Sequence, residues 1–204
     1  WENIDYFGKR GLDPVTGESK DERWSWDFDS IEVFNENPGW GFYDAELEVI
    51  ETRRSEFSVL QDWYNMLNAG RKIAAVGNSD SHTVTKNIAG IPRNYVYTGT
   101  DDAGNIDPAL VAKAIRDGRV STTTGPFIRI TANGQPMGST IQLDKPVVDI
   151  HISAKVASWI DLDTIQIIQN GDEVASVTYE GQRDGPLTLR PRLRIDAPRD
   201  CWVV

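Results

Sequence analysis

The chain has 204 residues, and its 31 Asp and Glu against 21 Lys and Arg give a formal net charge of −10. This length allows one large domain or two small ones with cores of their own. The acidic balance argues against a nucleic-acid partner, which needs a basic surface. No apolar stretch approaches the ~18 residues of a membrane span, and a single cysteine, Cys201, excludes a disulfide framework.

The first predicted elements alternate between strand and helix. Residues 29–35 form an apolar strand with a polar exit, and residues 44–69 form a helical stretch that Gly70 is well placed to end. The apolar face of that helix recurs at positions i, i+3, i+4 and i+7. Its members are Leu60, Trp63, Tyr64 and Leu67.

A second strand, residues 72–76, follows and leads into a small-polar loop. Asp107-Pro108 then opens a short helix, with Asp as the N-cap and Pro at the first helical position, and Gly118 closes it. Strand, helix, strand, helix predicts part of a parallel α/β sheet or barrel in residues 1–124.

After Gly125-Pro126 the sequence has the period of a strand throughout. Asn133-Gly134 and Asn170-Gly171 are two-residue hairpin signals, and the segment contains no helix candidate. We expect residues 125–204 to form a small antiparallel β-sandwich. Its expected strands are 127–131, 147–154, 164–168, 173–179, 187–195 and 202–204.

The strongest chemical signal lies at the end of the strand over residues 72–76, where Asp80 and His82 stand two residues apart. In extended backbone such side chains share a face. A carboxylate oxygen beside an imidazole nitrogen suits Zn²⁺, Mn²⁺ or Fe²⁺, and α/β barrels carry their chemistry where strands end. The pair predicts two ligands of a divalent metal, which do not complete a site alone.

Other polar residues are secondary candidates. Asn35, Asn78 and Ser79 could hydrogen-bond to a metal ligand or a substrate, although the last two also suit the turn itself. Glu32, three residues before Asn35, would point to the opposite face of a straight strand, and we expect it to pair with a nearby helix. His151, the other histidine, lies on the polar face of an alternating strand and is not expected to bind metal.

Several segments together resemble the PHP (polymerase and histidinol phosphatase) family, and within it the CehA/McbA-like metallohydrolase branch. No single motif is specific, but their order and spacing cover nearly the whole chain. These segments are residues 28–35, residues 63–70, residues 77–82, residues 114–120 and Gly125-Pro126.

The resemblance implies a distorted β/α barrel that binds up to three metal ions and hydrolyses phosphoesters or related bonds, followed by an immunoglobulin-like sandwich. Only the late Asp-x-His motif of the family carries over, onto Asp80 and His82. The early His-x-His pair has no counterpart and would lie before Trp1. We therefore expect a piece of a longer protein, the carboxyl-terminal part of a PHP-type barrel plus the sandwich.

Three functions follow for this chain. The first is a fragment of a metal-dependent hydrolase, inactive alone, that acts on a small phosphoester or related substrate and has its other metal ligands upstream. The second is a non-enzymatic binding module with a degenerate α/β scaffold and a ligand-recognising sandwich. The third is a purely structural interaction domain. The sequence leaves substrate, metal, compartment and oligomeric state open.

Overall fold

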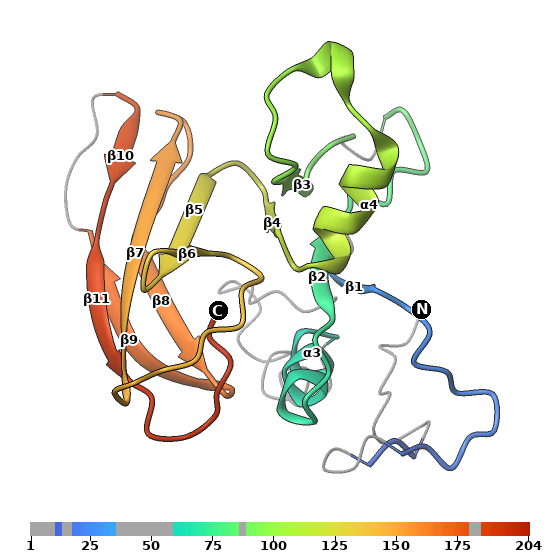
Figure 1. Ribbon diagram of the computed structural model, residues 1–204. Helices are drawn as coiled ribbons and strands as arrows, with labels where there is room; N and C mark the ends of the chain where they lie inside the picture. The colour runs from blue at the N-terminus through green and yellow to red at the C-terminus, as the bar shows by residue number, and fades with distance from the viewer. Residues whose placement is uncertain (1–10, 14–17, 36–58, 86–88, 180–184) are drawn as a thin grey trace, which may run out of the picture.

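A computed structural model describes residues 11–13, 18–35, 59–85, 89–179 and 185–204 of the chain (Figure 1). The strands that follow residue 125 gather on one side of the molecule, and the earlier strands and the helices lie on the other. Two separate clusters of buried apolar side chains correspond to these two groups of elements. No helix among the described residues is long and apolar enough to cross a membrane.

The first two strands form a parallel pair, as a βαβ unit requires. β1 (Ser30–Phe34) lies beside β2 (Ala74–Gly77), and helix α3 (Val59–Asn68) comes before β2 in the chain. Ile31 and Val33 alternate inward and are buried against α3. The register shifts between Glu32 and Phe34, so β1 is not a straight strand. Because β1 and β2 run parallel, their carboxyl ends lie at the same edge of the sheet.

Helix α3 packs an apolar face on the core, but the face is rotated from the predicted one: Val59, Trp63 and Met66 are buried, whereas Leu60, Tyr64 and Leu67 are only partly buried at its edge. Met66 is fully buried, and the indole Nε1 of Trp63 donates to the carbonyl of Ile73 at 2.8 Å. Gly70, at φ +75°, ends the helix, because the amides of Gly70 and Arg71 bond back to the last turn. The predicted end is confirmed, whereas the predicted residues 44–58 lie outside the described part of the chain.

The next elements are β3 (Arg93–Val96), a 3-10 turn η3 (Ala103–Asn105), α4 (Pro108–Arg116) and β4 (Val120–Thr123). Asp107 caps α4 by accepting from the Ala109 amide at 2.8 Å, and Gly118 ends it at φ +74°, both as expected. β3 and β4 pair antiparallel, which differs from the parallel arrangement expected of the whole α/β segment. The connection through η3 and α4 returns the chain beside β3 in the opposite direction, so, among the strands that the structure describes, parallel pairing is confirmed only for β1 and β2.

The sandwich is built on one long strand, β7 (Val147–Val156), in which every second side chain is buried. On one side β7 pairs with β5 (Phe127–Ala132), which turns at Asn133-Gly134 into β6 (Gln135–Pro136). On the other side it pairs with β10 (Leu187–Leu189) and β11 (Arg192–Asp196). All of these pairs are antiparallel, which confirms the all-β character predicted for this segment.

A hairpin of β8 (Thr164–Gln169) and β9 (Asp172–Thr178) covers the apolar face of this sheet. Its turn is Asn170-Gly171, with positive φ at both residues, as the sequence predicts. Ile150 from β7 and Ile167 from β8 are among the most buried side chains of the molecule, at 1% and 2% exposure. The sheet and the hairpin therefore enclose one core between two layers.

Two details of the expected strands are corrected. Residues 187–195 form two strands, because Pro191 has no amide to donate to β7, although its carbonyl still accepts from Ile152 at 3.0 Å. The register continues unchanged across this break. The expected strand 202–204 is a single bridge between Val203 and Gln169, and the Ile168 and Val204 main chains exchange hydrogen bonds at 2.9 Å.

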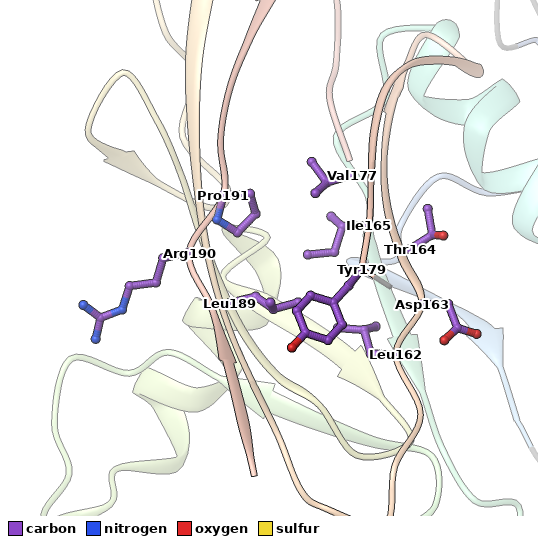
Figure 2. A pocket seen from close by; sticks show the side chains of 9 residues that line it. All are labelled: Leu162, Asp163, Thr164, Ile165, Val177, Tyr179, Leu189, Arg190 and Pro191. Atoms are coloured by element: carbon purple, nitrogen blue, oxygen red, sulfur yellow. The ribbon is translucent and has the colours of Figure 1, made fainter. Parts of the chain in front are cut away.

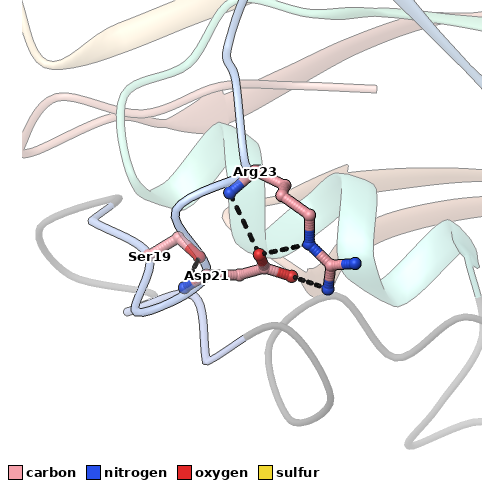
Figure 3. A network of polar contacts seen from close by, with 3 residues as sticks. All are labelled: Ser19, Asp21 and Arg23. Atoms are coloured by element: carbon pink, nitrogen blue, oxygen red, sulfur yellow. Dashed lines mark hydrogen bonds and ion pairs between the residues drawn. The ribbon is translucent and has the colours of Figure 1, made fainter.

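Local polar contacts join Ser19, Asp21 and Arg23, which precede β1 (Figure 3). The Asp21 carboxylate accepts from the main chain and from the guanidinium of Arg23 at 3.0–3.1 Å, and the Asp21 amide donates to Ser19 Oγ. The hydrogen bond with Asp21 raises the pKa of Arg23. Trp24 and Trp26 follow, with ring centroids 5.2 Å apart, and pack onto the core of the α/β half.

The two halves touch through aromatic side chains. The ring of Trp202, near the carboxyl end, stacks on Tyr64 of α3 with centroids 5.0 Å apart, and its Nε1 donates to Asn68 Oδ1 at 2.7 Å. Farther along the contact, Phe127 of β5 packs edge-on against Tyr95 of β3 at 4.9 Å. The division at residue 125 thus separates two cores that share an interface, and it stays a prediction that each half is a domain.

This interface gives a stability prediction. Trp202→Ala should lower the free energy of unfolding by roughly 1–3 kcal/mol, because it removes a stacked ring and a hydrogen bond to α3. Trp159→Ala is the matched control, since Trp159 is 83% exposed, and it should change stability by less than ~0.5 kcal/mol. Urea denaturation measures both. Equal effects of the two substitutions would show that Trp202 does not hold the halves together.

Candidate functional site

The predicted metal ligands lie in the loop that follows β2, residues 78–82, which we call the β2 loop. Asp80 has φ +50°, a left-handed conformation that aspartate adopts more readily than most residues. The His82 ring folds back onto it, with Nδ1 2.6 Å from the Asp80 carbonyl oxygen and 3.4 Å from the Asp80 carboxylate. The two side chains thus lie together as expected, but through a left-handed turn at Asp80 and not through the extended backbone on which the expectation was based.

The chemistry of this pair depends on which nitrogen of the ring carries the proton. If Nδ1 donates to the Asp80 carbonyl, the lone pair of the neutral ring is on Nε2, and Nε2 is the atom able to bind a metal. The two side chains are accessible, at 73% exposure for His82 and 35% for Asp80. The loop can thus present one carboxylate and one imidazole to a ligand that approaches from solvent.

A network of amides and one carboxylate lies at the ends of β1 and β2. Glu32 accepts from Asn35 Nδ2 at 2.9 Å and from Asn78 Nδ2 at 2.5 Å. Asn35 is buried, at 4% exposure. Asn35 and Glu32 do meet, in contrast to the expectation, because the register shift after Glu32 breaks the alternation of a straight strand.

The role expected for Glu32 is also corrected. Instead of pairing with a helix, its carboxylate joins the end of β1 to the first residue of the β2 loop. A carboxylate on a strand between two buried apolar residues needs such donors, since leaving it without a partner is costly. From the sequence, only the separation of three residues between Glu32 and Asn35 was known. The assumption of a straight strand led to the wrong relative orientation of their side chains.

Asn94, in β3, is a contributor that the sequence analysis missed. Its Oδ1 accepts from the Gly77 amide at 2.9 Å, and its Nδ2 donates to the Gly77 carbonyl at 2.8 Å and to Asn78 Oδ1 at 3.3 Å. One side chain thus satisfies both main-chain groups of the last β2 residue. An asparagine inside a strand, where its propensity is low, was the available signal.

Gly77 is the residue that allows this approach. A Cβ atom there would lie 2.0 Å from Oγ1 of Thr122 in β4 and 3.1 Å from the Phe34 carbonyl oxygen. No side chain fits between β1 and β4 at this position, so a residue without Cβ is required. The start of the β2 loop is therefore fixed from both sides, by β1 and by the β3–β4 pair.

The other predicted residues are placed as follows. Ser79 accepts from Ser81 Oγ at 3.0 Å, within the β2 loop. His151 is exposed on β7, as expected. In the described ranges, no three side chains of His, Cys, Asp or Glu form a group that could hold a metal ion. Asp80 and His82 are thus two potential ligands beside a fixed strand end, and their binding of metal stays a prediction.

A hollow of about 230 Å³ lies at one end of the sandwich, far along the chain from the β2 loop (Figure 2). Apolar side chains such as Ile165, Val177 and Leu189 line it, and the Tyr179 ring lies across it. The Arg190 side chain points away from it. The hollow offers apolar contact, and it contains no pair of groups comparable with Asp80 and His82.

Comparisons of the chain with models of protein families, with curated proteins and with solved structures found no match.

The role of Asn94 gives a second prediction. Asn94→Asp keeps the acceptor for the Gly77 amide but loses both donated bonds and places a carboxylate against a carbonyl, so the free energy of unfolding should fall by about 1–3 kcal/mol. Asn133→Asp is the matched control, because the side chain of Asn133 contributes only an acceptor, for the Asp149 amide. That variant should stay within ~0.5 kcal/mol of the wild type. Thermal or urea unfolding measures both variants. An equal loss of stability in the two would refute the role of the Asn94 hydrogen bonds to Gly77.

Proposed function

We propose that this chain is part of a metal-dependent hydrolase and that Asp80 and His82 are two of its metal ligands. One observation carries the proposal: a partly exposed carboxylate and an exposed imidazole share a loop at the carboxyl end of a parallel strand. The resemblance of the motifs to the PHP family supports it. On this proposal the α/β half is part of a PHP-type barrel, and the sandwich is immunoglobulin-like.

The metal would be Zn²⁺, Mn²⁺ or Fe²⁺, which accept mixed carboxylate and imidazole ligands. When bound, it would supply a Lewis acid for the hydrolysis of a small phosphoester or a related substrate. Asp80 and His82 would hold it, and the network of Glu32, Asn78 and Asn94 would fix the loop that carries them. Its other ligands would come from outside the described residues.

A second candidate is a non-enzymatic binding module. The observation that favours it is the sandwich, which encloses a core of its own and presents a broad strand surface to solvent. In that case the α/β half would be a scaffold, and Asp80 and His82 would be ordinary loop residues. The two candidates make different predictions: a metal-dependent hydrolase binds a divalent metal at His82 in preference to His151, and a binding module does not.

The presence of only two histidines permits a direct test. Mn²⁺ added to the protein should broaden the imidazole NMR signals of His82 at lower concentration than those of His151, because a paramagnetic ion acts at short range. His82→Ala and His151→Ala assign the two sets of signals. Asp80→Asn should weaken the selective broadening about fivefold or more, since a neutral amide is a poorer metal ligand than a carboxylate.

Stability separates a metal role from a structural one. Asn tolerates the left-handed backbone of Asp80, so Asp80→Asn should change the free energy of unfolding in metal-free buffer by less than ~1 kcal/mol, as should His82→Ala at an exposed position. Losses above ~2 kcal/mol would make both residues structural. Equal broadening of the two histidines, or none at millimolar Mn²⁺, would contradict the proposed metal site.

A further inference from the structure

The outward face of the sandwich sheet concentrates positive charge. Because side chains alternate along a strand, the neighbours of the buried β7 residues all point to solvent. The paired strands β5, β10 and β11 extend this surface on both sides. We call it the basic face, and its exposed members are Arg129, His151, Lys155, Arg190, Arg192 and Arg194.

The charge of the basic face is opposite in sign to the net charge of the chain. The basic face has five Lys or Arg side chains and two carboxylates, Asp149 and Asp196, whereas the chain carries a net charge of −10. Asp149 is already neutralised, because Arg194 binds both of its oxygens at 2.7 and 3.1 Å. The hydrogen bonds from Arg194 hold the pKa of Asp149 below its usual value. Arg129, Lys155, Arg190 and Arg192 are left, against the one remaining carboxylate, Asp196.

Strand register places these four cations around one point. Ser153 of β7 lies opposite Arg129 of β5. On the other side of β7, the continuous register of β10 and β11 places Arg190 opposite the same Ser153. Neighbouring strands are ~4.8 Å apart, and side chains on the same face of a strand are ~6.8 Å apart. The cations therefore converge within about 14 Å, and they come from β5, β7, β11 and the break between β10 and β11.

Arg129 is held in a defined orientation. Its guanidinium lies 5.3 Å from the centroid of the Phe127 ring and 5.9 Å from that of Tyr97. Cation–π contacts of this kind fix the plane of the guanidinium and leave its edge for hydrogen bonds. A fixed guanidinium loses little conformational freedom when it binds a carboxylate with two parallel hydrogen bonds.

We propose that the basic face binds a short acidic oligosaccharide whose carboxylates pair with Arg129, Arg190 and Arg192. The hydroxyls of Thr131, Ser153 and Thr188 stand among the cations, where they match sugar hydroxyls. A protein partner needs an apolar centre to its interface, whereas the apolar residues here, Phe127 and Val147, lie at opposite ends of the face. A long polyanion is disfavoured because the rest of the chain would repel it.

The test uses the whole chain and a galacturonic acid hexamer, with a neutral glucose hexamer as the control ligand. Calorimetry should show binding of the acidic hexamer alone, weakened by added salt, because the contacts are between exposed charges. Arg190→Gln with Arg192→Gln should reduce the affinity about tenfold or more, since charge-assisted hydrogen bonds are lost. Lys20→Gln with Arg93→Gln, which removes the same charge from exposed positions outside the face, should change it less than about twofold.

Each other outcome would overturn the proposal. Absence of binding to the acidic hexamer, or an equal loss in both double variants, would show that the face is not the site. Equal binding of a glutamate hexamer would show that the surface responds to charge and does not recognise sugar. The proposal does not depend on the metal site, because Asp80→Asn should leave affinity for the hexamer unchanged while it weakens the effect of Mn²⁺ on His82.

Discussion

The α/β half depends on the close approach of four strands at Gly77. The space there does not admit a Cβ atom, since Thr122 Oγ1 would lie 2.0 Å from it. Asn94 binds the amide and the carbonyl of the same residue, and Glu32 binds Asn78 directly after it. β1, β3 and β4 are thereby joined to the end of β2. The loop with Asp80 and His82 starts from a fixed point, and this is the geometric basis for treating the pair as a site.

Sequence patterns predicted the elements whose causes are local. The ends of α3 and α4 follow from Gly70 and Gly118, and the hairpin turns follow from their Asn-Gly pairs, because these residues tolerate positive φ at little cost. The alternation that exposes His151 was also readable, since one face of β7 is buried. In each case a few adjacent residues contain the whole physical reason for the structure.

The features that the sequence did not reveal depend on distant partners. Asn94 meets Gly77 across 17 positions, and nothing near Asn94 in sequence indicates this contact. The antiparallel pairing of β3 and β4 depends on the path of the chain between them, which periodicity does not determine. Glu32 was assigned the wrong partner because its geometry depends on an irregular register. For the candidate site, the Asp80–His82 pair was predicted and the network that fixes it was not.

The central claim is that the β2 loop binds a divalent metal through Asp80 and His82. Anomalous diffraction from a crystal of the protein soaked in Mn²⁺ tests it most directly, because the ion is located without reference to activity. The account predicts an anomalous peak about 2.0–2.3 Å from an Asp80 carboxylate oxygen and from His82 Nε2, distances typical of such ligands. Anomalous peaks only at other positions, or no peak at a β2 loop that is accessible in the crystal, would contradict the account.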